Sequence, residues 1–135
     1  IQTQYPDHPL YRALAAHDYA VFAAAQLAER ERAGFPPSTH QAMLRAEAPE
    51  LAQALAFLKA AGEVGDTLRT AEIMLYDTVP MRLHRLAHLE RAQLLAESRS
   101  RPALQAFIAQ WVAAVRSLKA PKALRWHIDV DPLEF

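Results

Sequence analysis

The sequence of 135 residues contains no cysteine and only three glycines. Without cysteine, the chain can form no disulfide and offers no thiolate to a metal or a substrate, which fits a reducing compartment. The three glycines form no glycine-rich loop of the kind that cradles phosphates. These two absences exclude a disulfide scaffold and a phosphate-binding loop within this chain.

Net charge and long apolar runs are missing as well. Fifteen basic residues cancel fifteen acidic ones, so only a local basic patch can favour nucleic acid. No apolar run approaches the ~20 residues that span a bilayer, and we recognise no export leader. The chain begins on Ile1 rather than Met, so we expect a fragment of a longer protein.

What the sequence does contain is a strict alternation at its end. The apolar residues are Leu124, Trp126, Ile128 and Val130, and the polar ones between them are Arg125, His127, Asp129 and Asp131. A period of two predicts a strand with one buried face. Pro132 ends the strand because it has no N–H for a ladder. The rest of the chain must therefore cover one face of this strand.

The preceding residues predict the elements that provide this cover. Period-two patterns predict strands at residues 41–47, 71–77 and 89–97. One helix opens at Pro49-Glu50 and closes at Gly62 and Gly65, and a second covers residues 102–119. Residues 79–81 are predicted to turn the chain, and residues 82–86 either extend the preceding strand or form an irregular arm. We predict an α+β fold, a split βαβ unit whose four-stranded antiparallel sheet carries both helices on one face.

A helical arm is predicted to precede this unit. Helices are expected at residues 10–15 and 19–33, with Asp18 as the N-cap of the second and Gly34 at its end. Tyr19, Phe22, Ala23 and Leu27 form its apolar stripe. The extended stretch Phe35-Pro36-Pro37-Ser38 predicts a boundary between domains at residues 1–38 and 39–135.

We predict no catalytic residue and no metal site in this chain. No serine or cysteine triad is recognised. His84 and His88 have the i,i+4 spacing of helical zinc ligands, but they fall in a stretch predicted to be extended or irregular. Asp129 and Asp131, roughly 6.6 Å apart on one strand face, suit a divalent ion or acid–base work. A simple polar strand face is the preferred interpretation of that pair.

Two surfaces are candidates for binding. The basic residues of the outer sheet face and its edge are Arg45, Arg82, Arg85, Arg91, Arg125 and His127. They form either a solvated face of mixed charge or a surface that binds a phosphate backbone or a protein. At the predicted helix entry Ser100-Arg101-Pro102, unpaired N–H groups and the helix dipole favour an anion beside Arg101. The carboxylate of a partner's C-terminus suits this position, and the alternative is an ordinary solvated arginine.

Both ends of the chain resemble one family. The closing stretch Arg125-Trp126-His127-Ile128-Asp129-Val130-Asp131-Pro132 resembles the closing signature of the primosomal protein N′ family, bacterial replication-restart DNA helicases. The stretches Pro6-Asp7-His8-Pro9, Leu27-Ala28-Glu29-Arg30 and Pro36-Pro37 resemble the segment that leaves the second helicase lobe of that family. Leu44-Arg45-Ala46-Glu47 resembles the strand that follows.

The resemblance implies that residues 1–38 end the second helicase lobe and that residues 39–135 are the C-terminal DNA- and partner-binding domain. It implies ATP-driven 3′-to-5′ unwinding and primosome loading by the parent protein, in the bacterial cytoplasm at replication forks. The sites for ATP, magnesium and zinc lie upstream in that family. We therefore expect no cofactor in this chain, and whether the chain is itself part of an enzyme depends on the parent.

The resemblance also implies partners. These are branched or forked DNA, the acidic C-terminal tail of single-stranded-DNA-binding protein, other primosome proteins and the helicase core, with no membrane. Arg101 and Gln105 match the family residues that bind the tail. The alternative function is a structural module that braces the helicase motor and has no ligand of its own.

Overall fold

The structure is a computed structural model that describes residues 2–86 and 88–133, with the backbone alone at residues 82–86. Its contacts divide the chain into two units, Ile1–Ser38 and Thr39–Phe135. The first unit holds α1 (Pro9–Ala15) and α2 (Tyr19–Ala33). The second holds β1 (His40–Ala48), α3 (Leu51–Leu68), β2 (Met74–Leu75), β3 (Val79–Leu86), β4 (Leu89–Ser98), α4 (Arg101–Arg116) and β5 (Arg125–Val130).

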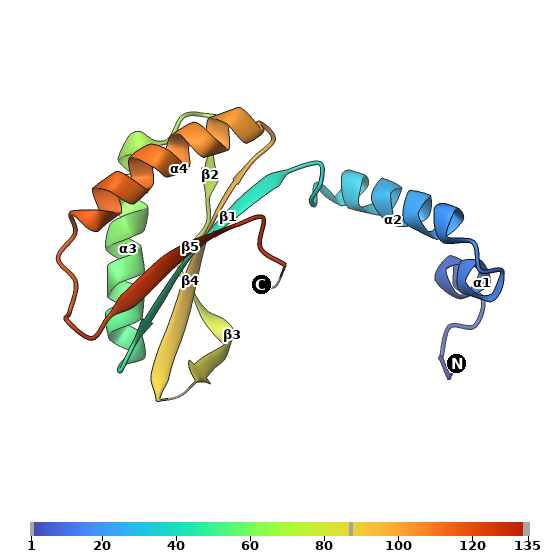
Figure 1. Ribbon diagram of the computed structural model, residues 1–135, viewed down its shortest axis with the longest axis horizontal. Coiled ribbons are helices and arrows are strands. Elements are labelled where there is room, and N and C mark those ends of the chain that lie inside the picture. The colour runs from blue at the N-terminus through green and yellow to red at the C-terminus, as the bar shows by residue number, and fades with distance from the viewer. Residues whose placement is uncertain (1, 87, 134–135) are drawn as a thin grey trace. The chain divides into compact units, whose positions relative to one another are not determined.

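The second unit is an antiparallel sheet with α3 and α4 on one face (Figure 1). The strand order is β2-β4-β1-β5, and β3 also pairs with β4. The central strands β1 and β4 pair along their whole length, from His40 opposite Ser98 to Ala48 opposite Glu90. This arrangement confirms the predicted α+β class and the two helices on one face.

The sheet has five strands rather than the four predicted. The stretch predicted as one strand over residues 71–77 forms only β2, and Val79-Pro80, predicted as a turn, begins β3. Both strands pair with β4: Met74 lies opposite Glu97, and Val79 lies opposite Gln93. Proline is tolerated here because β3 is an outer strand, where a missing N–H costs no central ladder bond. Of the two possibilities left open for residues 82–86, the strand is correct.

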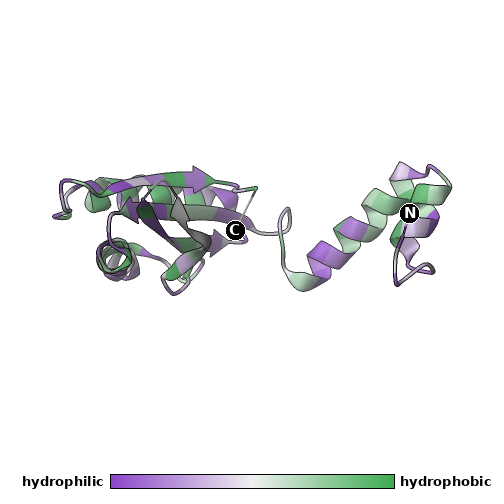
Figure 2. Cartoon of the chain, turned by 90° about the horizontal axis from the view of Figure 1, so that it is seen from below, coloured by the Kyte–Doolittle hydropathy of each residue, from purple (hydrophilic) through white to green (hydrophobic). Residues whose placement is uncertain are grey.

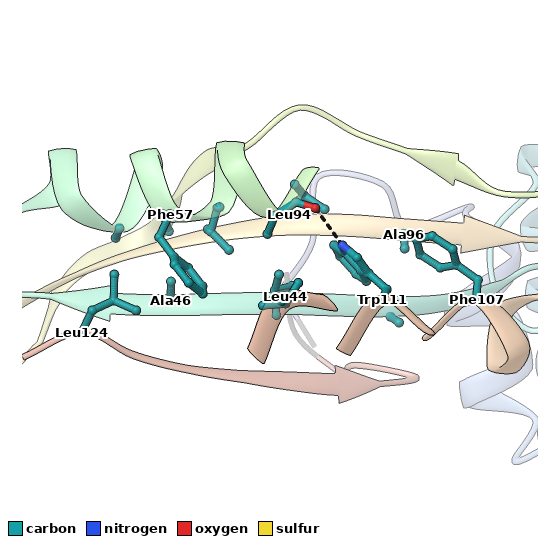
Figure 3. Packing of buried hydrophobic residues seen from close by; sticks show 14 of the residues in the cluster. Leu44, Ala46, Phe57, Leu94, Ala96, Phe107, Trp111 and Leu124 are labelled. Atoms are coloured by element: carbon teal, nitrogen blue, oxygen red, sulfur yellow. Dashed lines mark hydrogen bonds between the residues drawn. The ribbon is translucent and has the colours of Figure 1, made fainter. Parts of the chain in front are cut away.

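The predicted end of the first sheet-covering helix was also wrong, because α3 continues through both glycines to Leu68. A Cβ on Gly65 would lie 2.7 Å from Leu75 Cδ1 and 2.9 Å from Trp111 Nε1. The glycine therefore serves the close approach of neighbouring elements rather than the end of the helix. The fully buried indole N–H of Trp111 donates a hydrogen bond of 2.8 Å to the Ala61 carbonyl (Figure 3). This bond joins α4 to α3 inside the core.

One apolar cluster lies between the helices and the sheet (Figure 3). Leu44 of β1, Leu58 of α3 and Val115 of α4 are almost completely buried. From the final stretch, Leu124 is buried and Trp126 packs on the cluster, with its ring 6.2 Å from that of Phe57. The predicted inner face of the last strand is therefore confirmed over most of its length. Val130, at its end, is 47% exposed.

The helical unit agrees closely with its predicted bounds, and its apolar stripe is largely exposed. Asp18 caps α2 by accepting a hydrogen bond of 3.0 Å from the Val21 N–H, and Gly34 ends the helix with φ +69°. Tyr19 is 76% exposed and Leu27 is 50% exposed. The hydrophilic residues of α2 gather at its C-terminal end (Figure 2). Among the helices that the structure describes, none is both long and apolar enough to span a membrane.

Candidate binding surfaces

The sheet face opposite the helices arranges its side chains in rows across β4, β1 and β5. Residues directly opposite one another share a row, because cross-strand partners point to the same face. The rows, in order along the strands, are Arg91, Glu47 and Arg125; Gln93, Arg45 and His127; Leu95, Met43 and Asp129; Glu97, Gln41 and Asp131. The first two rows hold three arginines, a histidine and one carboxylate. The last two hold three carboxylates, so charge is segregated along the strands.

The basic rows differ in how far their side chains reach solvent. Arg125 and His127 of β5 are exposed, and Arg91 of β4 is half-buried. The Arg45 side chain is only 15% exposed, and its guanidinium lies 3.3 Å from the Asp129 carboxylate. The structure thus brings these four predicted DNA-binding residues to one end of the sheet. Arg125 and His127 are the accessible members.

Two further predicted DNA-binding residues, Arg82 and Arg85, have their backbone in β3. Their side chains lie outside the part of the chain that the structure describes. Where they reach therefore stays a prediction.

The second candidate surface is the N-terminal end of α4. Ser100, at the predicted helix entry, caps this helix with its Oγ accepting a hydrogen bond of 3.3 Å from the Ala103 N–H. Arg101 is the first helical residue, and Gln105 follows one turn later. Both are exposed, and a spacing of four places them on the same helix face. The structure therefore brings the two residues predicted to bind an acidic tail side by side.

A carboxylate of this chain already stands beside Arg101. The guanidinium of Arg101 lies 3.6 Å from the Asp131 carboxylate, and the two side chains are 61% and 51% exposed. The backbone N–H of Asp131 donates a hydrogen bond of 2.9 Å to the Gln41 carbonyl, and its φ is +54°. Sequence reasoning missed this pairing, because thirty residues separate Arg101 from Asp131.

The two surfaces are well separated. Arg125 begins β5, and Asp131 directly follows its last residue. Six residues of extended chain span roughly 20 Å. Because Arg101 pairs with Asp131, the acidic-tail candidate lies at the opposite end of this strand from the basic rows. The two candidate surfaces therefore have no residue in common.

The two carboxylates at the end of the last strand pair with different arginines. Asp129 pairs with Arg45, whereas Asp131 pairs with Arg101. Within the described residues, no three histidine, aspartate or glutamate side chains gather as a metal site would require. Each carboxylate therefore orients an arginine.

A hydrogen-bonded group at the acidic end was not predicted. Gln41 Nε2 donates to Glu97 Oε2 at 2.6 Å, and the Tyr76 hydroxyl donates to Glu97 Oε1 at 3.2 Å. Burial of the hydroxyl, then the negative charge of Glu97 and the bond to it, raise the pKa of Tyr76 above its usual value. The phenol therefore stays a neutral donor. The group is invisible in the sequence because its members come from three different strands or their flanks.

Comparison with known proteins gives consistent matches. Residues 31–133 match the family described as primosomal protein N C-terminal domain. The chain is 32% identical over 132 residues to "Replication restart protein PriA" of Haemophilus influenzae, covering 98% of this chain and 18% of that protein. It is 28% identical over 135 residues to the protein of the same name from Synechocystis, covering 98% of this chain and 15% of that protein. The chain thus spans less than a fifth of these relatives.

Among solved structures, the fold resembles "De novo designed protein Foldit4" with a TM-score of 0.50. The likeness covers 70% of this chain and 97% of that one at 5% sequence identity. An identity this low concerns the fold alone.

Proposed function

Because the chain belongs to the primosomal protein N C-terminal domain family, we propose that it serves replication restart by binding branched DNA through the basic rows of its sheet. The observation that carries this proposal is the segregation of charge on the outer face. Arg45, Arg91, Arg125 and His127 occupy two adjacent rows at one end. DNA phosphates are attracted to such a patch, and the affinity for DNA falls as the salt concentration rises.

The test is a titration of the 135-residue chain with a labelled forked DNA over a range of salt concentrations. Arg125→Gln removes an exposed cation from the patch, so we expect weaker binding and a salt slope reduced by about one. Arg116→Gln, which removes an exposed arginine at the end of α4, is the matched control and should bind like the wild type. Absence of binding at low salt, or equal loss in both variants, contradicts the proposal.

The same domain is proposed to hold the acidic C-terminal tail of single-stranded-DNA-binding protein at Arg101 and Gln105. Support comes from the exposed guanidinium at a helix N-terminus, where a carboxylate is favoured. We expect Arg101→Ala to weaken binding of a synthetic tail peptide by roughly tenfold, measured by fluorescence anisotropy. The control is Arg99→Ala, which removes an exposed arginine just before the helix cap. It should leave the affinity for the tail peptide unchanged. Equal affinities for Arg101→Ala and wild type rule out the site.

The activities of a parent protein are a further part of this proposal, which rests on the family resemblance. We propose that this chain belongs to a parent that unwinds forks in the 3′-to-5′ direction with ATP, magnesium and zinc sites elsewhere, contacts its helicase core and other primosome proteins, and works in the bacterial cytoplasm. The chain has no cysteine to offer zinc. Its own contribution in this scheme is binding.

A structural role is the alternative, and the helical unit favours it. Leu10, Leu14, Tyr19 and Phe22 line an open apolar pocket of about 380 Å³ between α1 and α2. Exposed apolar surface of this kind marks an interaction site. If bracing the motor is its role, the chain should self-associate in sedimentation experiments, through residues 1–38. A monodisperse chain that binds DNA contradicts this alternative.

A further inference from the structure

The outer face of the sheet has a pocket beside the residues that link β2 to β3. It has a volume of about 330 Å³, at the small end of the ~300–1,000 Å³ typical of ligand pockets. Its lining residues are Met43, Tyr76, Asp77, Val79, Gln93 and Leu95. Gln93 shares a basic row with Arg45, and Met43 and Leu95 form part of the next row. The other three residues lie outside the two surfaces described above.

Gln93 brings an unused acceptor to this pocket. The residue is only 9% exposed, and its Oε1 atom accepts no hydrogen bond from any residue that the structure describes. A buried carbonyl without a donor is costly and uncommon in native proteins. Arg45, directly opposite on β1, is directed to Asp129 at 3.3 Å. The Oε1 atom lies beneath the pocket surface, so a ligand's N–H group can satisfy it only if the Gln93 side chain turns toward the pocket.

The walls combine apolar surface, an aromatic ring and negative charge. Met43 is 1% exposed, and Leu95 is half-buried. Tyr76 is fixed at both ends, because its N–H donates to the Leu95 carbonyl at 2.9 Å and its hydroxyl donates to Glu97 at 3.2 Å. Asp77 adds an exposed carboxylate at the rim. These carboxylates repel a phosphodiester and attract a cation.

We propose that this pocket receives an arginine side chain of a partner protein. The arginine methylenes pack against Met43 and Leu95, and the flat guanidinium donates to the Asp77 carboxylate beside the Tyr76 ring. It also donates to Gln93 Oε1 once that side chain turns into the pocket. Arginine suits this set because it combines an apolar stem with five donors and stacks on aromatic rings. The proposal depends neither on DNA binding nor on the acidic-tail site.

The test is a nuclear magnetic resonance titration of the 135-residue chain with the capped peptide acetyl-Gly-Arg-Gly-amide. We expect shifts at the backbone amides of Tyr76, Gln93 and Leu95, and roughly tenfold weaker binding when citrulline replaces arginine. Asp77→Asn and Gln93→Met should each weaken the arginine peptide by a similar factor. Glu72→Gln neutralises an exposed acid outside the pocket and should bind like the wild type.

Two controls keep the result interpretable. Gln93→Met removes the unsatisfied carbonyl while nearly preserving volume, so its unfolding midpoint in urea should not fall below that of the wild type. If the midpoint of Gln93→Met does fall, the affinity of Asp77→Asn, a surface substitution, tests the proposal instead. Equal binding of the citrulline peptide, unchanged affinity in Asp77→Asn, or stronger shifts of the same amides by deoxyadenosine monophosphate would each overturn the proposal.

Discussion

Asp131 joins the end of β5 to the start of α4. Its N–H is bonded to the Gln41 carbonyl and its carboxylate lies beside Arg101. The backbone of Asp131 has φ +54°, in the left-handed region that aspartate and asparagine tolerate better than most residues. Any acidic ligand of Arg101 must therefore compete with this carboxylate.

Asp131→Asn should raise the affinity for the acidic tail peptide. The substitution keeps a residue that accepts the left-handed backbone and removes the competing charge. Because exposed ion pairs contribute about 0–1 kcal/mol, we expect a gain of up to about fivefold in fluorescence anisotropy. Asp129→Asn, which affects the Arg45 pair instead, should leave this affinity unchanged. A lower affinity in Asp131→Asn contradicts competition.

The two glycines of α3 allow a matched test of close packing. In Gly65→Ala the new Cβ meets Leu75 Cδ1 at 2.7 Å and the rigid Trp111 indole at 2.9 Å. Overpacking of about 1–3 kcal/mol should exceed the gain of about 1 kcal/mol in helix propensity, so urea unfolding should show lower stability. In Gly62→Ala the Cβ meets only Leu94 Cδ1, at 3.0 Å. That variant should stay within about 1 kcal/mol of the wild type, and equal losses in both contradict this account.

At the scale of elements, the two faces of β5 meet different surroundings, the core on one side and solvent on the other. Trp126 packs on the core cluster beside Phe57, whereas His127 points outward and is exposed. A strand alternates faces with every residue, so neighbouring residues take part in different functions. The same alternation on β1 buries Leu44 among the helices and places Arg45 on the outer face.

Substitutions of two neighbours on β5 should have separate effects. We expect Trp126→Ala to lower the free energy of unfolding by about 2–4 kcal/mol, because a large ring leaves the cluster. His127→Ala should stay within about 0.5 kcal/mol of the wild type in urea unfolding, since its side chain is exposed. The same variant should bind forked DNA more weakly. Similar destabilisation by both changes would mean that the two faces are not distinct.

At the scale of the whole molecule, the two units differ in how they are stabilised. Every member of the large core cluster lies between Ala42 and Leu124, inside the second unit. In the first unit, Ala13 is the only described residue that is buried. The second unit therefore contains what a domain needs to fold alone.

Deletion of residues 1–38 should leave the second unit intact. Because its core cluster is complete without them, we expect the urea midpoint, followed by the near-ultraviolet signal of Trp111 and Trp126, to match that of the 135-residue chain. Forked-DNA binding should be retained as well. A large fall in the midpoint would show that the helical unit contributes to the core.

Periodicity alone determined much of this molecule. It predicted the α+β class, the cores of β1, β4 and β5, and the long helices, because helix and strand patterns are local properties of consecutive residues. Residue type likewise predicted the cap at Asp18 and the helix entry at Ser100. Periodicity also assigned Arg45, Arg125 and His127 to the outer face, since alternation follows from the strand itself.

Only the tertiary structure decided which distant residues meet. It shortened one predicted strand to β2, formed β3 where a turn was predicted, carried α3 through Gly62 and Gly65, and joined Arg101 to Asp131. It also assembled the pocket lined by Tyr76 and Gln93 from three strands and their flanks. These features depend on how elements approach and align, and no local pattern records the space that a neighbouring side chain such as Trp111 will occupy.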